Sequence, residues 1–80
     1  MQIWLDCQFY GGTYRRSGRY AKARSLEGAV REAKAMFDTY KVPAGQIMLV
    51  EGNPYVPAAY HGYVVKQSAT ETPYHDPEAI

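Results

Sequence analysis

The apolar positions of residues 25–40 recur at intervals of three and four, which is the period of an α-helix with one buried face. Ser25 is suited to cap this helix, because its hydroxyl can accept a hydrogen bond from a free backbone N–H of the first turn. Val42-Pro43 ends it, since proline disfavours helical backbone in the residue before it. The expected buried face consists of Leu26, Ala29, Val30, Ala33, Phe37 and Tyr40.

Residues 2–10 alternate between the two sides of a β-strand, and two glycines then end the strand. One side carries Ile3, Leu5, Cys7 and Phe9, and the other carries Gln2, Trp4, Asp6, Gln8 and Tyr10. Residues 11–18 form either a long hairpin loop or a short strand with a turn. Alternation returns over 19–24, where Ala21 and Ala23 point inward and Tyr20, Lys22 and Arg24 point outward.

After the helix, residues 46–51 form an apolar run that indicates a strand buried on both faces or central in its sheet. Gly52-Asn53-Pro54 predicts a turn. Residues 55–59 are ambiguous, because Pro57 restricts any strand there to the edge of the sheet. Residues 60–67 read as the last strand, with a bulge at Gly62.

The element order is therefore β-β-α-β-β, and the sequence predicts a single α+β domain over residues 1–67, with a mainly antiparallel sheet and one helix packed on one face. Residues 68–80 contain two prolines and three acidic residues, and we expect a loose tail. One helix covers one face only. The other face would expose Trp4, Tyr10 and Tyr20, with Met48 or Ile47 according to register, and such a patch marks an interaction site for a second copy or a foreign partner.

The composition excludes few classes of protein. The chain has eighty residues, a net charge of +1 and a single cysteine, Cys7, so it forms no internal disulfide. No apolar run has the length of a membrane span, and we expect a soluble, cytoplasmic protein. Eight tyrosines are unusual, and they suit either a binding surface or exposed strand positions.

A basic segment lies between Tyr10 and Arg24. Its charged residues are Arg15, Arg16, Arg19, Lys22 and Arg24, without an acidic residue, and they are interleaved with Tyr10, Tyr14 and Tyr20. Arginine binds phosphates and carboxylates through two parallel hydrogen bonds, and tyrosine stacks on bases or anchors a protein interface. The segment is compatible with nucleic-acid contact, with a protein contact, or with a solvated hairpin that protects the sheet edge.

No arrangement typical of a catalytic, cofactor or metal site stands out. Cys7 points into the expected core, where cysteine behaves as a small apolar residue. His61 and His75 lack the spacing of zinc ligands. Gly11-Gly12-Thr13 lacks the lysine and the following helix of a phosphate loop. We expect a protein without enzymatic activity, cofactor or metal.

The segment from Arg19 to Ala33, with its motif Ala-Arg-Ser-Leu-x-x-Ala at 23–29, looks like a strand that runs into a capped helix in small phage-encoded domains. The order of elements over residues 2–67 resembles compact anti-CRISPR proteins that act on type I surveillance complexes. This resemblance implies a non-catalytic inhibitor that works in the cytoplasm of a bacterial host. It would bind a protein subunit of the crRNA-guided complex (Cascade) and prevent target DNA binding.

The candidate partner-binding residues combine the basic segment with the aromatic side of the first strand. They are Arg15, Arg16, Arg19, Tyr20, Lys22, Arg24, Trp4, Tyr10 and Tyr14. Two alternatives remain open at this point: a small nucleic-acid-binding domain that uses residues 15–24, and a structural protein that forms a homodimer through its sheet. The expected oligomeric state is monomer or homodimer.

Overall fold

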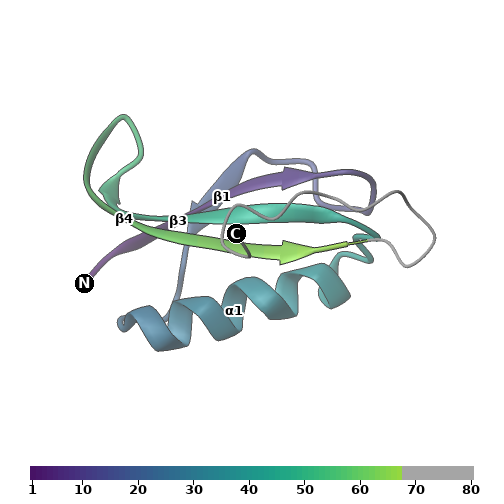
Figure 1. Ribbon diagram of the computed structural model, residues 1–80, viewed down its shortest axis with the longest axis horizontal. Helices are drawn as coiled ribbons and strands as arrows, with labels where there is room; N and C mark the ends of the chain where they lie inside the picture. The colour runs from purple at the N-terminus through teal and green to yellow at the C-terminus, as the bar shows by residue number, and fades with distance from the viewer. Residues whose placement is uncertain (68–80) are drawn as a thin grey trace.

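The computed structural model describes residues 1–67 and confirms the predicted α+β fold in its β-β-α-β-β order. The predicted C-terminal tail, residues 68–80, lies outside the described residues. Figure 1 shows one helix along one face of a twisted sheet. The sheet has four antiparallel strands in the spatial order β2-β1-β3-β4. The elements are β1 (Ile3–Phe9), β2 (Gly18–Tyr20), α1 (Leu26–Thr39), β3 (Gly45–Asn53) and β4 (Val56–Lys66).

Helix α1 begins and is oriented as its sequence predicts. The Ser25 Oγ accepts a hydrogen bond from the Gly28 N–H at 3.1 Å, which satisfies one of the free donors of the first turn. Ala29, Ala33 and Phe37 of the predicted face are buried, and Met36, which the prediction left out, is buried with them. The other members of the predicted face are only partly buried: Leu26, Val30 and Tyr40. The helix ends at Thr39, one turn before Pro43, and Lys41 adopts left-handed backbone with a φ of 54°.

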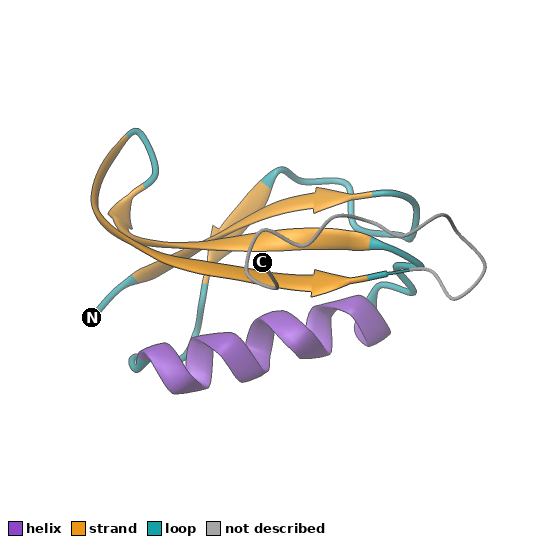
Figure 2. Cartoon of the chain, in the orientation of Figure 1, coloured by secondary structure: helices purple, strands orange, loops and turns teal. Residues whose placement is uncertain are grey.

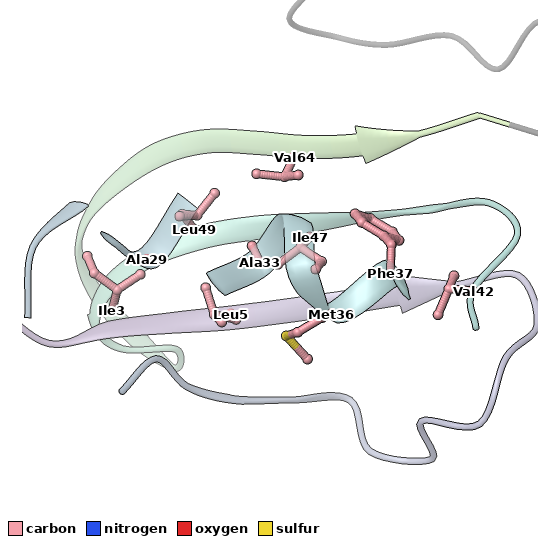
Figure 3. Packing of buried hydrophobic residues seen from close by; sticks show 10 residues of the cluster. All are labelled: Ile3, Leu5, Ala29, Ala33, Met36, Phe37, Val42, Ile47, Leu49 and Val64. Carbon is pink, nitrogen blue, oxygen red and sulfur yellow. The ribbon is translucent and has the colours of Figure 1, made fainter. Parts of the chain in front are cut away.

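The core lies between α1 and the strands, as the helix-and-sheet layers of Figure 2 suggest. Leu5 and Ile47 are fully buried beneath the helix, and each such side chain contributes about 1.5–3 kcal/mol of burial free energy. Cys7 and Phe9 pack against the same cluster from the partly buried end of β1. The cluster shown in Figure 3 consists of Ile3, Leu5, Ala29, Ala33, Met36, Phe37, Val42, Ile47, Leu49 and Val64.

The β3–β4 hairpin differs from the prediction, because residues 56–66 form one continuous strand. Pro57 is tolerated since β4 lies at the edge of the sheet. Met48 pairs with Tyr63 but Val50 with Tyr60, so β4 carries an extra residue at the predicted bulge, where Gly62 has a φ of 97°. A second register shift follows at Glu51–Gly52. In Figure 1 this hairpin curves away from the helix.

Strand β2 is shorter than the alternation over 19–24 predicts. The Ala21 N–H still donates to the Ile3 carbonyl at 2.7 Å, beyond the last residue of the strand. The next two backbone N–H groups, of Lys22 and Ala23, donate to the Glu32 carboxylate on α1 at 2.9 and 3.2 Å. The chain therefore leaves the sheet at this point and crosses to the helix.

Candidate functional site

One row of side chains crosses all four strands on the face of the sheet that turns away from α1. Directly paired residues of antiparallel strands point to the same face. The register pairs Trp4 with Tyr20 on one side and with Val50 on the other, and Val50 with Tyr60. We call this set, Tyr20, Trp4, Val50 and Tyr60, the aromatic row, and the face that carries it the open face.

The aromatic row is anchored by Trp4 at its centre. The Trp4 and Tyr20 rings meet edge to face, with centroids 5.0 Å apart and planes at 81°. The Trp4 Nε1 lies 3.4 Å from the Asp6 Oδ1, and the ring covers Gly18 closely, since a Cβ there would lie 2.9 Å from Trp4 Cζ2. The indole is half-buried and fixed in place, whereas 38% of Tyr20 is exposed.

The projecting end of the β3–β4 hairpin adds apolar residues that sequence reasoning missed. Tyr55, Val56 and Tyr60 are 91%, 76% and 64% exposed, the highest values among the large apolar residues of the described chain. The Tyr55 N–H donates to the Asn53 Oδ1 at 2.8 Å, which fixes the turn. Tyr60 lies on this face because it pairs with Val50. That pairing depends on the register shift in β4, which the sequence pattern alone does not give.

The residues of the basic segment do not form one patch. Arg15 and Arg16 line a pocket at the end of α1, whereas Lys22 and Arg24 line a separate hollow beside the N-terminus. Tyr10 is 53% exposed just after β1, where its N–H donates to the Ala44 carbonyl at 2.9 Å. Contact of these residues with a partner stays a prediction.

Arg19 lies on the helix side of the sheet, because its register partner is the core residue Leu5. Its guanidinium donates to the Glu32 carboxylate, and only 25% and 17% of the two side chains are exposed. Burial raises the pKa of Glu32, but hydrogen bonds from the Lys22 N–H, Arg19 and the Ala23 N–H outweigh it, so the pKa lies below its ordinary value. The acid that neutralises Arg19 is thus outside the basic segment.

Tyr14 is a packing residue of the loop between β1 and β2. Its ring makes edge-to-face contacts with Phe9 and Tyr40, at centroid distances of 5.8 and 4.7 Å. The hydroxyl is buried and has no hydrogen-bond partner within residues 1–67. Burial raises the pKa of this phenol, with the neighbouring Cys7 adding to the shift. The ring is therefore not free to stack on a base.

The remaining candidate groups are the Cys7 thiol and the His61 imidazole. Burial, together with the Asp6 charge, raises the pKa of the Cys7 thiol to about 12, so the thiolate is scarce at neutral pH. The His61 Nε2 lies 2.9 Å from the Glu51 Oε1 in a half-buried pair. No group of three metal-ligating side chains occurs within residues 1–67, and His75 lies outside the described chain.

No helix in the described part of the chain is both long and apolar enough to cross a membrane. The exposed aromatic side chains make the open face, with its aromatic row and the hairpin end, the candidate site. Comparisons of the whole chain with protein-family models, curated proteins and solved structures find no match.

Proposed function

We propose that this chain is a non-enzymatic binding protein whose contact surface is the aromatic row together with the hairpin end at Tyr55 and Val56. The observation that carries the proposal is the exposure of Tyr20 and Tyr60 at the two ends of one row across the open face. Val50, between them, is buried and Trp4 is half-buried, so the exposed apolar area of the row lies at its two ends and joins the hairpin residues Tyr55 and Val56. Exposed aromatic surface of this kind is typical of protein interaction sites. Tyrosine and tryptophan are the residues that most often dominate such interfaces.

The partner we propose is a protein subunit of a type I crRNA-guided complex, and this part rests on the resemblance to anti-CRISPR proteins. Residues 1–67 contain nine basic and five acidic residues, which is the opposite of the charge that a DNA mimic needs. The inhibitor would therefore bind a protein surface through its aromatic row, with Lys22 and Arg24 as exposed basic neighbours.

The test is binding of the full-length chain to a purified, immobilised type I complex. Tyr60→Lys and Tyr20→Lys are expected to weaken binding about thirtyfold or more, because each removes an exposed aromatic anchor at one end of the row. Ala35→Lys is the matched control, since it adds the same charge on the exposed side of α1. Unchanged affinity in both tyrosine variants, or an equal loss in the control, would contradict the proposed surface.

A nucleic-acid-binding function is the second candidate, and the observation that favours it is that Arg15 and Arg16 form no ion pair within residues 1–67. Phosphate contacts release counterions, so this function predicts affinity for plain DNA or RNA that falls steeply with salt. The packed Tyr14 ring and the neutralised Arg19 remove two of the expected contacts, which is why the aromatic row is the better supported surface.

A further inference from the structure

A small pocket lies where the loop between β1 and β2 meets the C-terminal end of α1. Its volume is about 320 Å³, and its walls are Thr13, Tyr14, Arg15, Arg16, Arg19 and Tyr40. We propose that this pocket binds a phosphate monoester, the dianionic phosphoryl group of a small ligand. The site is separate from the aromatic row, so the inference goes beyond the proposed function.

The charge of the pocket matches a dianion. Three arginines line it, and Glu32 neutralises one of them, Arg19. Arg15 and Arg16 have no carboxylate partner in the described chain, so two positive charges are uncompensated. A phosphate monoester carries about −1.5 to −2 at neutral pH, and arginine binds its oxygens in pairs. A carboxylate or a phosphodiester carries a single negative charge and would leave one arginine unmatched.

The loop that carries these arginines is already fixed in place. Thr13 donates to the Tyr40 carbonyl through its N–H at 2.8 Å and its hydroxyl at 3.2 Å. The Arg15 Nη1 donates to the Gly12 carbonyl at 2.9 Å. These bonds satisfy the Tyr40 carbonyl at the C-terminal end of the helix. A ligand therefore meets an ordered loop and spends little binding free energy on ordering it.

The two tyrosines add an aromatic wall to the pocket. The Tyr14 and Tyr40 rings meet at 4.7 Å, and the buried Tyr14 hydroxyl has no acceptor among residues 1–67. Because this hydroxyl is buried, the two rings offer a ligand apolar contact and the arginines supply the hydrogen-bond donors. The volume lies at the small end for ligand sites, which fits a phosphoryl group on a small aryl or sugar carrier.

The test uses phenyl phosphate and inorganic phosphate as probes, titrated at constant ionic strength into the full-length chain and followed by amide NMR. We expect saturable shifts at Thr13, Arg15 and Arg16. The double variant Arg15→Gln/Arg16→Gln should bind phenyl phosphate at least about tenfold more weakly, because it loses charge-assisted hydrogen bonds. Arg24→Gln is the matched control, being an exposed arginine outside the pocket.

Saturable binding of inorganic phosphate as tight as that of phenyl phosphate also supports the proposal, because the phosphoryl group then suffices. Absent or non-saturating shifts would overturn it, as would an equal loss of affinity in Arg24→Gln. A single-stranded oligonucleotide without a terminal phosphate that binds here while phenyl phosphate does not would assign the pocket to nucleic-acid backbone. Arg15 and Arg16 are exposed, so the variants should fold, and their amide spectra check this. The aromatic row is unaltered in them, so their result does not bear on the proposed function.

Discussion

Glu32 of α1 accepts a hydrogen bond from the Arg19 guanidinium of β2, and the same carboxylate binds the backbone N–H groups of Lys22 and Ala23. One side chain thus joins the edge strand, the chain that leaves it and the helix. This explains how a strand of three residues holds its place at the edge of the sheet. It also keeps Tyr20, the next residue along, in register with Trp4 on the open face.

Removing the charge of Glu32 should therefore destabilise the domain. We expect Glu32→Gln to lower the free energy of unfolding by about 1–3 kcal/mol, because the new amide cannot satisfy Arg19 and both backbone donors. Urea unfolding measures the change. The matched control is Glu27→Gln, which breaks the exposed Glu27–Arg31 pair at 3.3 Å and should cost less than about 0.5 kcal/mol. Equal effects of the two substitutions would refute the role of Glu32.

The stabilisation by Glu32 should also depend on pH. Its pKa in the folded state lies below the ordinary value of 4.5, so the unfolded chain binds the proton more tightly than the folded protein does. The contribution is complete above pH 4.5 and is lost as the pH falls through the folded pKa. The stability difference between wild type and Glu32→Gln should shrink in acid when both are unfolded with urea at neutral and at acidic pH. A stability difference that is the same at both pH values would contradict stabilisation by the ionised Glu32 carboxylate.

Gly18 of β2 lies close against β1. A Cβ at this position would come within 2.4 Å of the Leu5 carbonyl oxygen and 2.9 Å of Trp4 Cζ2. Gly18→Ala should cost about 1–3 kcal/mol, because the strand and the indole must both move. Thermal unfolding and Trp4 fluorescence report the two effects, with Ser17→Ala as the neighbouring exposed control. Native stability and an unaltered emission spectrum in Gly18→Ala would show that the row tolerates this shift.

Cys7 should be unreactive in the folded protein. Its pKa of about 12 leaves almost no thiolate at neutral pH, and thiolate is the form that reacts with alkylating reagents. We expect iodoacetamide to modify Cys7 far more slowly in native buffer than in denaturant, as measured by mass spectrometry. Similar rates in the two solvents would mean that the thiol is accessible and not desolvated.

The elements with a strong local pattern could be predicted from the sequence. The spacing of Ala29, Ala33 and Phe37 indicated the buried face of α1, and Ser25 indicated its start. The alternation of Ile3, Trp4 and Leu5 gave the two faces of β1, and all of these features are confirmed. Each depends on neighbours within a few residues, where period and capping chemistry are informative.

What depends on register or on distant pairing could not be predicted. The Arg19–Glu32 pair joins residues thirteen apart and needs β2 to lie beside α1, which no local pattern indicates. The place of Tyr60 in the aromatic row depends on the extra residue that β4 accommodates near Gly62, since one residue of slip moves a side chain to the opposite face. Burial of Tyr14 likewise follows from its contact with Tyr40 across the loop.

The central claim, that the open face contacts a protein partner, is tested most directly at Trp4, the only tryptophan in the chain. Fluorotryptophan at this position gives a single fluorine NMR signal from the middle of the aromatic row. Addition of a purified type I complex is predicted to shift or broaden this signal in the wild-type chain and to leave it unchanged in Tyr60→Lys. Binding that is detected by an independent assay while the Trp4 signal stays unchanged would contradict the account.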